Sequence, residues 1–230
     1  MKRLPGKILL SAAVLLLSLS VWGQKRIYTR SFMIQDFKSK TTKVVLDESN
    51  AFNAALRQEI TSLWTVSPYE FCTKAEYDKQ KNSPDCYFLH AETEKDIVFL
   101  TLSRGGKEDD ADALKRPVTV LSIPVSGTRD TSGRSSVYMP AFISLMQDFT
   151  EAAMNSEMVA YQGLKAIKTK APKDLRIYTD PDEAADAFLS NYEGSAVQLI
   201  ISADGSSAGK PRYKMVIGTS GYELYSYGKN

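Results

Sequence analysis

Cysteine and histidine are scarce in this sequence. Two cysteines in 230 residues exclude a disulfide scaffold and a zinc site built from cysteines alone. A single histidine excludes a metal site with several imidazole ligands. Because 43% of the residues are hydrophobic and 24% are charged, the composition also excludes collagen-like, low-complexity and disordered classes. A chain of this length buries enough surface to fold without a metal ion or a disulfide.

The N-terminus has the pattern of a secretory signal peptide. Lys2, Arg3 and Lys7 precede an uncharged run over residues 8–22, and the expected cleavage lies before Gln24. A membrane-spanning helix needs about 20 apolar residues, so this run is short for a transmembrane anchor. The sequence therefore predicts export to the periplasm, the cell envelope or the extracellular space, with no transmembrane span after cleavage.

Cleavage of residues 1–23 changes the charge of the protein. It removes three of the 29 basic residues and none of the 27 acidic residues, which leaves a nearly neutral chain. Such a chain has no excess positive field for phosphate backbones, so nucleic acid is not an expected partner. We expect residues 24–230 to form one α/β domain. A boundary near residues 126–136 is the alternative, because that stretch is polar and contains glycine.

The exported part alternates short strands with amphipathic helices. Strands are predicted at residues 28–37, 69–72, 86–91, 97–103, 118–125, 175–179, 197–203, 213–218 and 222–227, and helices at 50–64, 74–81, 140–168 and from Asp180. The longest helix should break near Asn155 or Gly163. This order predicts an α+β or mixed α/β fold, with a single mixed sheet covered by helices mainly on one face.

Part of this order resembles a known group of domains. The strand at 32–37, the helix at 52–63, the strand at 69–71 and the helix start at 75–77 are similar in order to the α/β domain of periplasmic assembly proteins. The curli secretion channel and the N-terminal domain of the Tol-system β-propeller protein are examples. The signal peptide ending in Gly-Gln is also similar to exported proteins of Bacteroidota. The resemblance implies an envelope location and assigns no functional residue.

Two loops contain residues typical of ligand-binding motifs in an unsuitable arrangement. Residues 204–211 include Gly205, Gly209 and Lys210. A P-loop has four residues between its glycines, whereas three stand here, and its lysine is followed by the start of a helix, whereas Pro211 follows Lys210. Residues 107–112 include Glu108, Asp109, Asp110 and Asp112, but a calcium loop needs alternating acids and an internal glycine. We therefore predict no cofactor and no metal site.

His90 is the one imidazole available as a general base. It lies in a predicted strand, and no Gly-x-Ser-x-Gly motif sets a serine on a sharp turn. A catalytic pair of the Cys72 thiol with the His90 imidazole is the alternative. The sequence predicts no catalytic residue.

Four tyrosines near the C-terminus form the candidate binding surface: Tyr213, Tyr222, Tyr225 and Tyr227. Their rings could stack on the apolar face of a carbohydrate or a peptide. Packing within strands is the alternative, because tyrosine is also favoured there.

Cys72 and Cys86 allow two interpretations. Export to an oxidising compartment favours a disulfide between them. If the helix at 74–81 instead connects adjacent parallel strands, the two cysteines lie at opposite ends of the sheet. Their Cα atoms would then be farther apart than the roughly 7 Å that a disulfide spans.

Together these observations predict an exported, non-enzymatic binding or assembly module. Its partner would be another envelope protein or a surface polymer. A hydrolase of envelope or extracellular polymer, with carboxylates brought together by folding, is one alternative. A carrier of a small ligand is the other.

Overall fold

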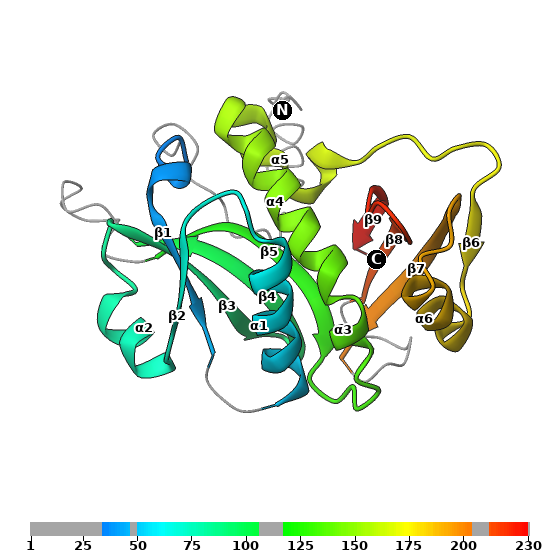
Figure 1. The fold of residues 1–230 in the computed structure, drawn as a ribbon, viewed down its shortest axis with the longest axis horizontal. Coiled ribbons are helices and arrows are strands. Elements are labelled where there is room, and N and C mark those ends of the chain that lie inside the picture. The colour runs from blue at the N-terminus through cyan, green and yellow to red at the C-terminus, as the bar shows by residue number, and fades with distance from the viewer. Residues whose placement is uncertain (1–33, 47–49, 106–116, 204–211, 230) are drawn as a thin grey trace, which may run out of the picture.

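Two mixed β-sheets and six α-helices make up the described part of the chain (Figure 1). The structure is a computed structural model that describes residues 34–46, 50–105, 117–203 and 212–229. The predicted α+β class is confirmed, but the prediction of a single sheet is wrong. Strand patterns show which side chains are buried and do not show which strands pair, so the division into two sheets was not visible in the sequence.

The first sheet has five strands in the order β2-β1-β3-β4-β5. β1 pairs in parallel with β2 on one side and β3 on the other, and β3, β4 and β5 follow as antiparallel neighbours. The strands are β1 (Thr41–Val45), β2 (Tyr69–Cys72), β3 (Cys86–Glu94), β4 (Ile97–Arg104) and β5 (Val118–Gly127).

Helices α1 (Ala51–Leu63) and α2 (Lys74–Gln80) cover opposite faces of this sheet. α1 begins at Asn50, whose side chain accepts a hydrogen bond from the Asn53 amide at 2.9 Å. α1 packs in the main core, which includes Val44. The ring of Tyr77 on α2 lies 5.1 Å from that of Phe88, in a separate small cluster with Val45. Val44 and Val45 are adjacent in β1 and therefore point to opposite faces of the sheet. The two helices that pack with them lie on these opposite faces.

The predicted strand at residues 28–37 does not extend into the described chain. Residues 34–36 are not in a strand, η1 (Phe37–Ser39) is a 3-10 turn, and β1 begins four residues after Phe37. Ile34, which precedes this turn, and Phe37, which begins it, are both buried. Their apolar character therefore reflects packing in the core and not a strand. Residues 28–33 lie outside the described residues.

The long predicted helix breaks at both expected places. It divides into α4 (Met139–Asn155), α5 (Glu157–Gln162) and η2 (Gly163–Ile167), after the short α3 (Arg134–Val137). Ser156 is extended, and Gly163 has a φ of +60°, which is a conformation that glycine adopts readily. In Figure 1, α4 runs through the middle of the molecule, between the two sheets.

The second sheet has four strands in the order β6-β7-β8-β9. They are β6 (Arg176–Tyr178), β7 (Ser195–Ser202), β8 (Arg212–Gly218) and β9 (Leu224–Lys229). α6 (Pro181–Leu189) connects the parallel pair β6 and β7, and the Asp180 side chain caps it through the amides of Asp182 and Glu183. One core cluster contains buried residues from both sheets and from α4. In the described ranges, no helix combines the length and apolar character needed to cross a bilayer.

Both cysteines are buried and free, so the disulfide interpretation is corrected. β1 lies between their strands, and it pairs Cys72 with Val45 and Cys86 with Thr41. Two strand spacings separate the cysteines laterally by about 10 Å, and the register separates them by about 13 Å along the strands. Both separations exceed the distance of roughly 7 Å that a disulfide can span.

We expect thiol titration of the unreduced, unfolded protein to find two free thiols. In the folded protein both should react slowly, because burial raises the pKa of the Cys72 thiol to about 11 and also raises that of Cys86. Ellman's reagent with and without denaturant measures both states. Absence of free thiols after unfolding would contradict the strand order.

Candidate binding groove

A groove of about 260 Å³ lies where the two sheets meet. We call it the aromatic groove. Strands β3, β4 and β5 of the first sheet, α5 with η2, and strands β8 and β9 of the second sheet supply its walls. The lining residues are Glu92, Glu94, Phe99, Thr101, Thr119, Val120, Leu121, Ser122, Tyr161, Gln162, Gly163, Leu164, Lys165, Tyr213, Tyr227 and Lys229.

Three aromatic rings form one wall of the aromatic groove. The rings of Tyr213 and Tyr227 are stacked with centroids 6.4 Å apart, and Phe99 meets Tyr213 edge-on at 5.6 Å. The ammonium of Lys229 lies 5.4 Å from the Tyr213 ring centroid, within cation–π distance. Burial, together with the neighbouring Tyr213, raises the pKa of the Tyr227 phenol, so this phenol is neutral over the physiological range.

Another part of the lining comes from the break between α5 and η2. A Cβ placed on Gly163 would lie 3.9 Å from Leu121 of β5, so the chain approaches β5 closely at this turn. Leu164 is buried beside it, whereas Tyr161 is 62% exposed at the rim. Two carboxylates and two ammonium groups add charges of both signs to the lining: Glu92, Glu94, Lys165 and Lys229.

The structure separates the four predicted tyrosines into two groups. Tyr213 and Tyr227 lie together in the aromatic groove. Tyr222 instead stacks on Phe188 of α6 at 5.5 Å, and Tyr225 lies beside Glu223. Tyr222 has a φ of +60° and precedes β9, so the strand predicted at residues 222–227 begins later and Tyr222 is not part of it.

His90 lies in a second crevice, of about 420 Å³, near the end of β1 and the start of α1. Its ring is 4.9 Å from that of Tyr77, and its Nε2 lies 3.3 Å from the Ser103 hydroxyl. Ser103 is buried within β4 rather than set on a sharp turn, so this pair lacks the geometry of a serine nucleophile. In the described residues, no group of three acidic, histidine or cysteine side chains could hold a metal ion.

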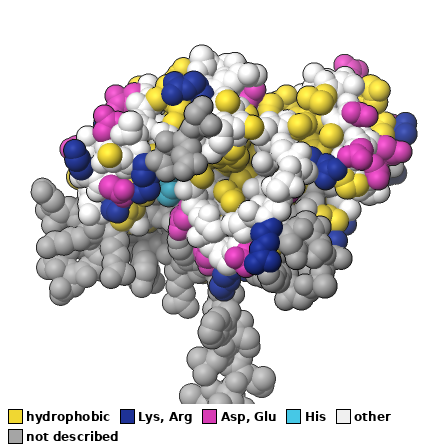
Figure 2. All heavy atoms as spheres, turned by 90° about the horizontal axis from the view of Figure 1, so that it is seen from below, with side chains coloured by type: hydrophobic (Ala, Val, Ile, Leu, Met, Phe, Trp, Pro, Cys, Tyr) yellow, Lys and Arg dark blue, Asp and Glu magenta, His cyan; other side chains and the backbone are white. Residues whose placement is uncertain are grey.

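A further exposed surface lies on α6 and β6, at the right of Figure 2, where hydrophobic side chains are visible. Leu189, Tyr192 and Ile177 are 66%, 50% and 45% exposed there. The Gly-Lys loop at 204–211 and the acidic segment at 107–112 lie outside the described residues.

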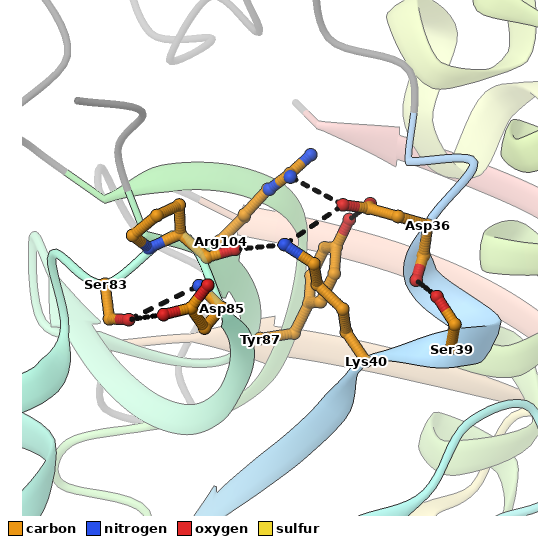
Figure 3. A network of polar contacts seen from close by, with 8 residues as sticks. Asp36, Ser39, Lys40, Ser83, Asp85, Tyr87 and Arg104 are labelled. Atoms are coloured by element: carbon orange, nitrogen blue, oxygen red, sulfur yellow. Dashed lines mark hydrogen bonds and ion pairs between the residues drawn. The ribbon is translucent and has the colours of Figure 1, made fainter. Parts of the chain in front are cut away.

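A polar network fixes the segment before β1 onto the first sheet (Figure 3). The Asp36 carboxylate accepts hydrogen bonds from the Tyr87 hydroxyl at 2.7 Å and from the Arg104 guanidinium at 2.6 Å. Lys40 lies 3.2 Å from the same carboxylate and also donates to the Pro84 carbonyl. Burial opposes ionisation, but the Tyr87 hydrogen bond and the charges of Arg104 and Lys40 outweigh it and lower the pKa of Asp36. The network has the character of a structural anchor.

The end of β5 meets the end of β7 where Gly127 leaves no room for a side chain. A Cβ there would lie 2.1 Å from the Ser202 carbonyl oxygen. Hydrogen bonds from Thr128 to Asp96 and from Arg129 to Ala203 tie the following stretch to both sheets. The stretch at residues 126–136, where a domain boundary was the alternative, therefore contacts both sheets, and Ser126, Gly127 and Thr128 line the crevice that holds His90.

We expect Gly127→Ala to lower the free energy of unfolding by about 1 to 3 kcal/mol, because backbone must move to admit the methyl group. Gly228→Ala is the matched control, since no atom lies within 4 Å of a Cβ at that position in β9. Urea unfolding of both variants measures the difference. Equal midpoints would contradict a close contact at Gly127.

Comparison of the chain with protein-family models, with curated proteins and with solved structures finds no match. The aromatic groove is therefore defined by its geometry alone. Of the residues that line the groove, the sequence analysis named Tyr213 and Tyr227 and did not name Phe99, Tyr161 or the β5 segment. Pro124 within β5 was an available signal, because proline inside a sheet is confined to edge strands, the first strand position and bulges.

Proposed function

We propose that this protein is an exported binding module of the cell envelope and that the aromatic groove holds its ligand. The observation that carries the proposal is the meeting of Phe99, Tyr213 and Tyr227, from both sheets, in one concave wall. Concave sites with apolar walls and a few polar groups are the usual form of ligand sites. The predicted signal peptide supports the location.

The composition of the groove favours binding over catalysis. The ring wall is apolar, with Tyr213 itself buried. Gln162 and Ser122 add polar groups to the lining, and the Ser122 hydroxyl is paired at 3.0 Å with that of buried Thr101. Among the described residues, the lining holds two carboxylates, Glu92 and Glu94, two residues apart on β3. Their spacing of about 7 Å along the strand is the one feature that favours the hydrolase alternative.

Tyr161 offers a direct test of the proposal. Its side chain is exposed at the groove rim, so Tyr161→Ala should fold normally and lose ligand contact. Tyr192→Ala is the matched control, because Tyr192 is also exposed but lies outside the groove lining. We expect Tyr161→Ala to bind purified envelope from the native host about tenfold more weakly in a sedimentation assay. Tyr192→Ala should bind like the unmodified protein.

Two results would contradict the proposal. Equal binding by both variants and the unmodified protein would place the ligand elsewhere. Release of soluble fragments from the envelope by the unmodified protein, but not by Glu92→Gln, would replace the binding module with a hydrolase.

A further inference from the structure

The exposed apolar side chains of the protein gather on two surfaces. Six large hydrophobic side chains are exposed among the described residues, and all six follow α4 in the chain. Met158 and Tyr161 on α5 are 63% and 62% exposed. Three more lie on or beside α6 and β6, and these are Ile177, Leu189 and Tyr192, while the sixth is on β7. Exposed apolar side chains that are grouped in this way mark interaction surfaces.

The surface on α6 and β6 is acidic. Residues 177–203 contain five acidic residues and no lysine or arginine. The buried residues of α6 face the core, so Glu183, Asp186 and Leu189, which are spaced three residues apart, lie on its exposed side. Figure 2 shows acidic side chains beside the hydrophobic ones at this end of the molecule. The members of this surface, which we call the acidic patch, are Ile177, Glu183, Asp186, Leu189, Tyr192 and Glu193.

The surface on α5 and η2 is basic. Residues 158–173 contain four lysines and no acidic residue. Met158 and Tyr161 are three residues apart on α5 and therefore neighbours on its surface. Tyr161 and Lys165 both line the aromatic groove and are both exposed, and Lys168, at the end of η2, is exposed as well. We call these four residues the basic patch.

The two patches complement each other, because charges of opposite sign accompany exposed apolar side chains in both. In Figure 1, α5 lies near the top of the molecule and α6 at the lower right, so the two patches belong to different sides of one copy. The predicted cleavage of residues 1–23 leaves a nearly neutral chain, and copies of such a chain repel each other little. Complementary charges around apolar contacts select a partner and fix its orientation. These observations point to a second copy of this chain as the partner.

We infer that copies of this protein associate head to tail, with the acidic patch of one copy on the basic patch of the next. Such a contact leaves one patch of each kind open at the two ends, so association continues past a dimer toward a ring or a filament. The patches contain few residues compared with the roughly 20 to 30 per side of a standard interface, so the contact is weak. The inference goes beyond the proposed function. A neighbouring copy would lie at the entrance of the aromatic groove, because Tyr161 and Lys165 belong to both surfaces.

Sedimentation velocity of the exported protein tests the inference. We expect its weight-average sedimentation coefficient to rise by roughly half between about 10 µM and about 1 mM, and to rise less in high salt, which screens exposed charges. Lys168→Glu and Asp186→Lys should each weaken association about tenfold. A chain that carries both changes should associate more strongly than either single variant, because opposite charges face each other again.

Asp85→Lys is the matched control, because Asp85 is exposed but lies beside the first sheet, and it should associate like the unmodified protein. A sedimentation coefficient that does not change with concentration would overturn the inference. Association that neither single reversal weakens, or that stops at a dimer, would overturn it as well.

Envelope binding separates this inference from the proposed function. Lys168 and Asp186 do not line the aromatic groove, so both reversals should bind envelope like the unmodified protein while they lose self-association. If the unmodified protein stays monomeric and Tyr161→Ala still loses envelope binding, the head-to-tail contact is rejected and the aromatic groove remains the ligand site.

Discussion

Phe149→Ala on α4 is expected to lower the free energy of unfolding by about 3 to 5 kcal/mol, the range for removing a buried phenylalanine ring. Phe149 is fully buried in the cluster that contains residues of both sheets. A domain of this size has a total stability of about 5 to 15 kcal/mol, so the variant should lose a large part of it. Urea unfolding followed by circular dichroism measures the loss.

Met158→Ala is the control for this prediction, because Met158 on α5 is 63% exposed and its loss leaves no cavity. The shape of the transition gives a second readout. Because α4 is part of the one core that joins both sheets, Phe149→Ala should move a single transition. Two separate transitions, with the variant shifting only one, would show that the sheets unfold independently.

Asp36→Ala is expected to cost about 2 to 3 kcal/mol, because it leaves the Arg104 guanidinium buried without its carboxylate and the Tyr87 hydroxyl without its acceptor. The Arg104 side chain is 7% exposed and the Asp36 side chain is 33% exposed. The partial exposure of Asp36 screens the ion pair, so the cost falls below that of a fully buried pair. Asp78→Ala is the control, because the Asp78 ion pairs on α2 are exposed.

The same network predicts a pH dependence of stability. The pKa of Asp36 is lowered in the folded protein from its ordinary value of 3.8, so the folded state holds its proton less tightly than the unfolded state. Its contribution is complete above the ordinary value and is lost as the pH falls through the lowered one. We expect Asp36→Asn to flatten the fall in unfolding free energy below about pH 4. An unchanged slope would show that other carboxylates dominate there.

Local signals predicted most elements of the fold well. The cap at Asp180 with Pro181 placed the start of α6, and Asn50 placed that of α1. The break at Gly163 followed from glycine in an apolar helical pattern. These features depend on neighbours in sequence, so they are readable from sequence.

Features that depend on pairing between distant segments were not readable. Nothing near Cys72 or Cys86 indicated that β1 would lie between their strands. The position of β1 was missed because Ile34 and Phe37 supplied a stronger apolar signal than residues 41–45. Likewise, Tyr213 resembled Tyr222 and Tyr225 in the sequence, and only the meeting with Phe99 of the first sheet separates it from them.

The two interruptions of the long helix have a consequence for ligand range. α5 is six residues long and lies between extended Ser156 and Gly163. The backbone hydrogen-bond ladder of α4 therefore ends before α5 begins. A short element with an exposed rim residue opens at a lower free energy than the core helix next to it. We therefore expect α5 and η2, which line the aromatic groove, to shift more readily than α4. A groove with one rigid wall and one adjustable side would accommodate ligands of different sizes.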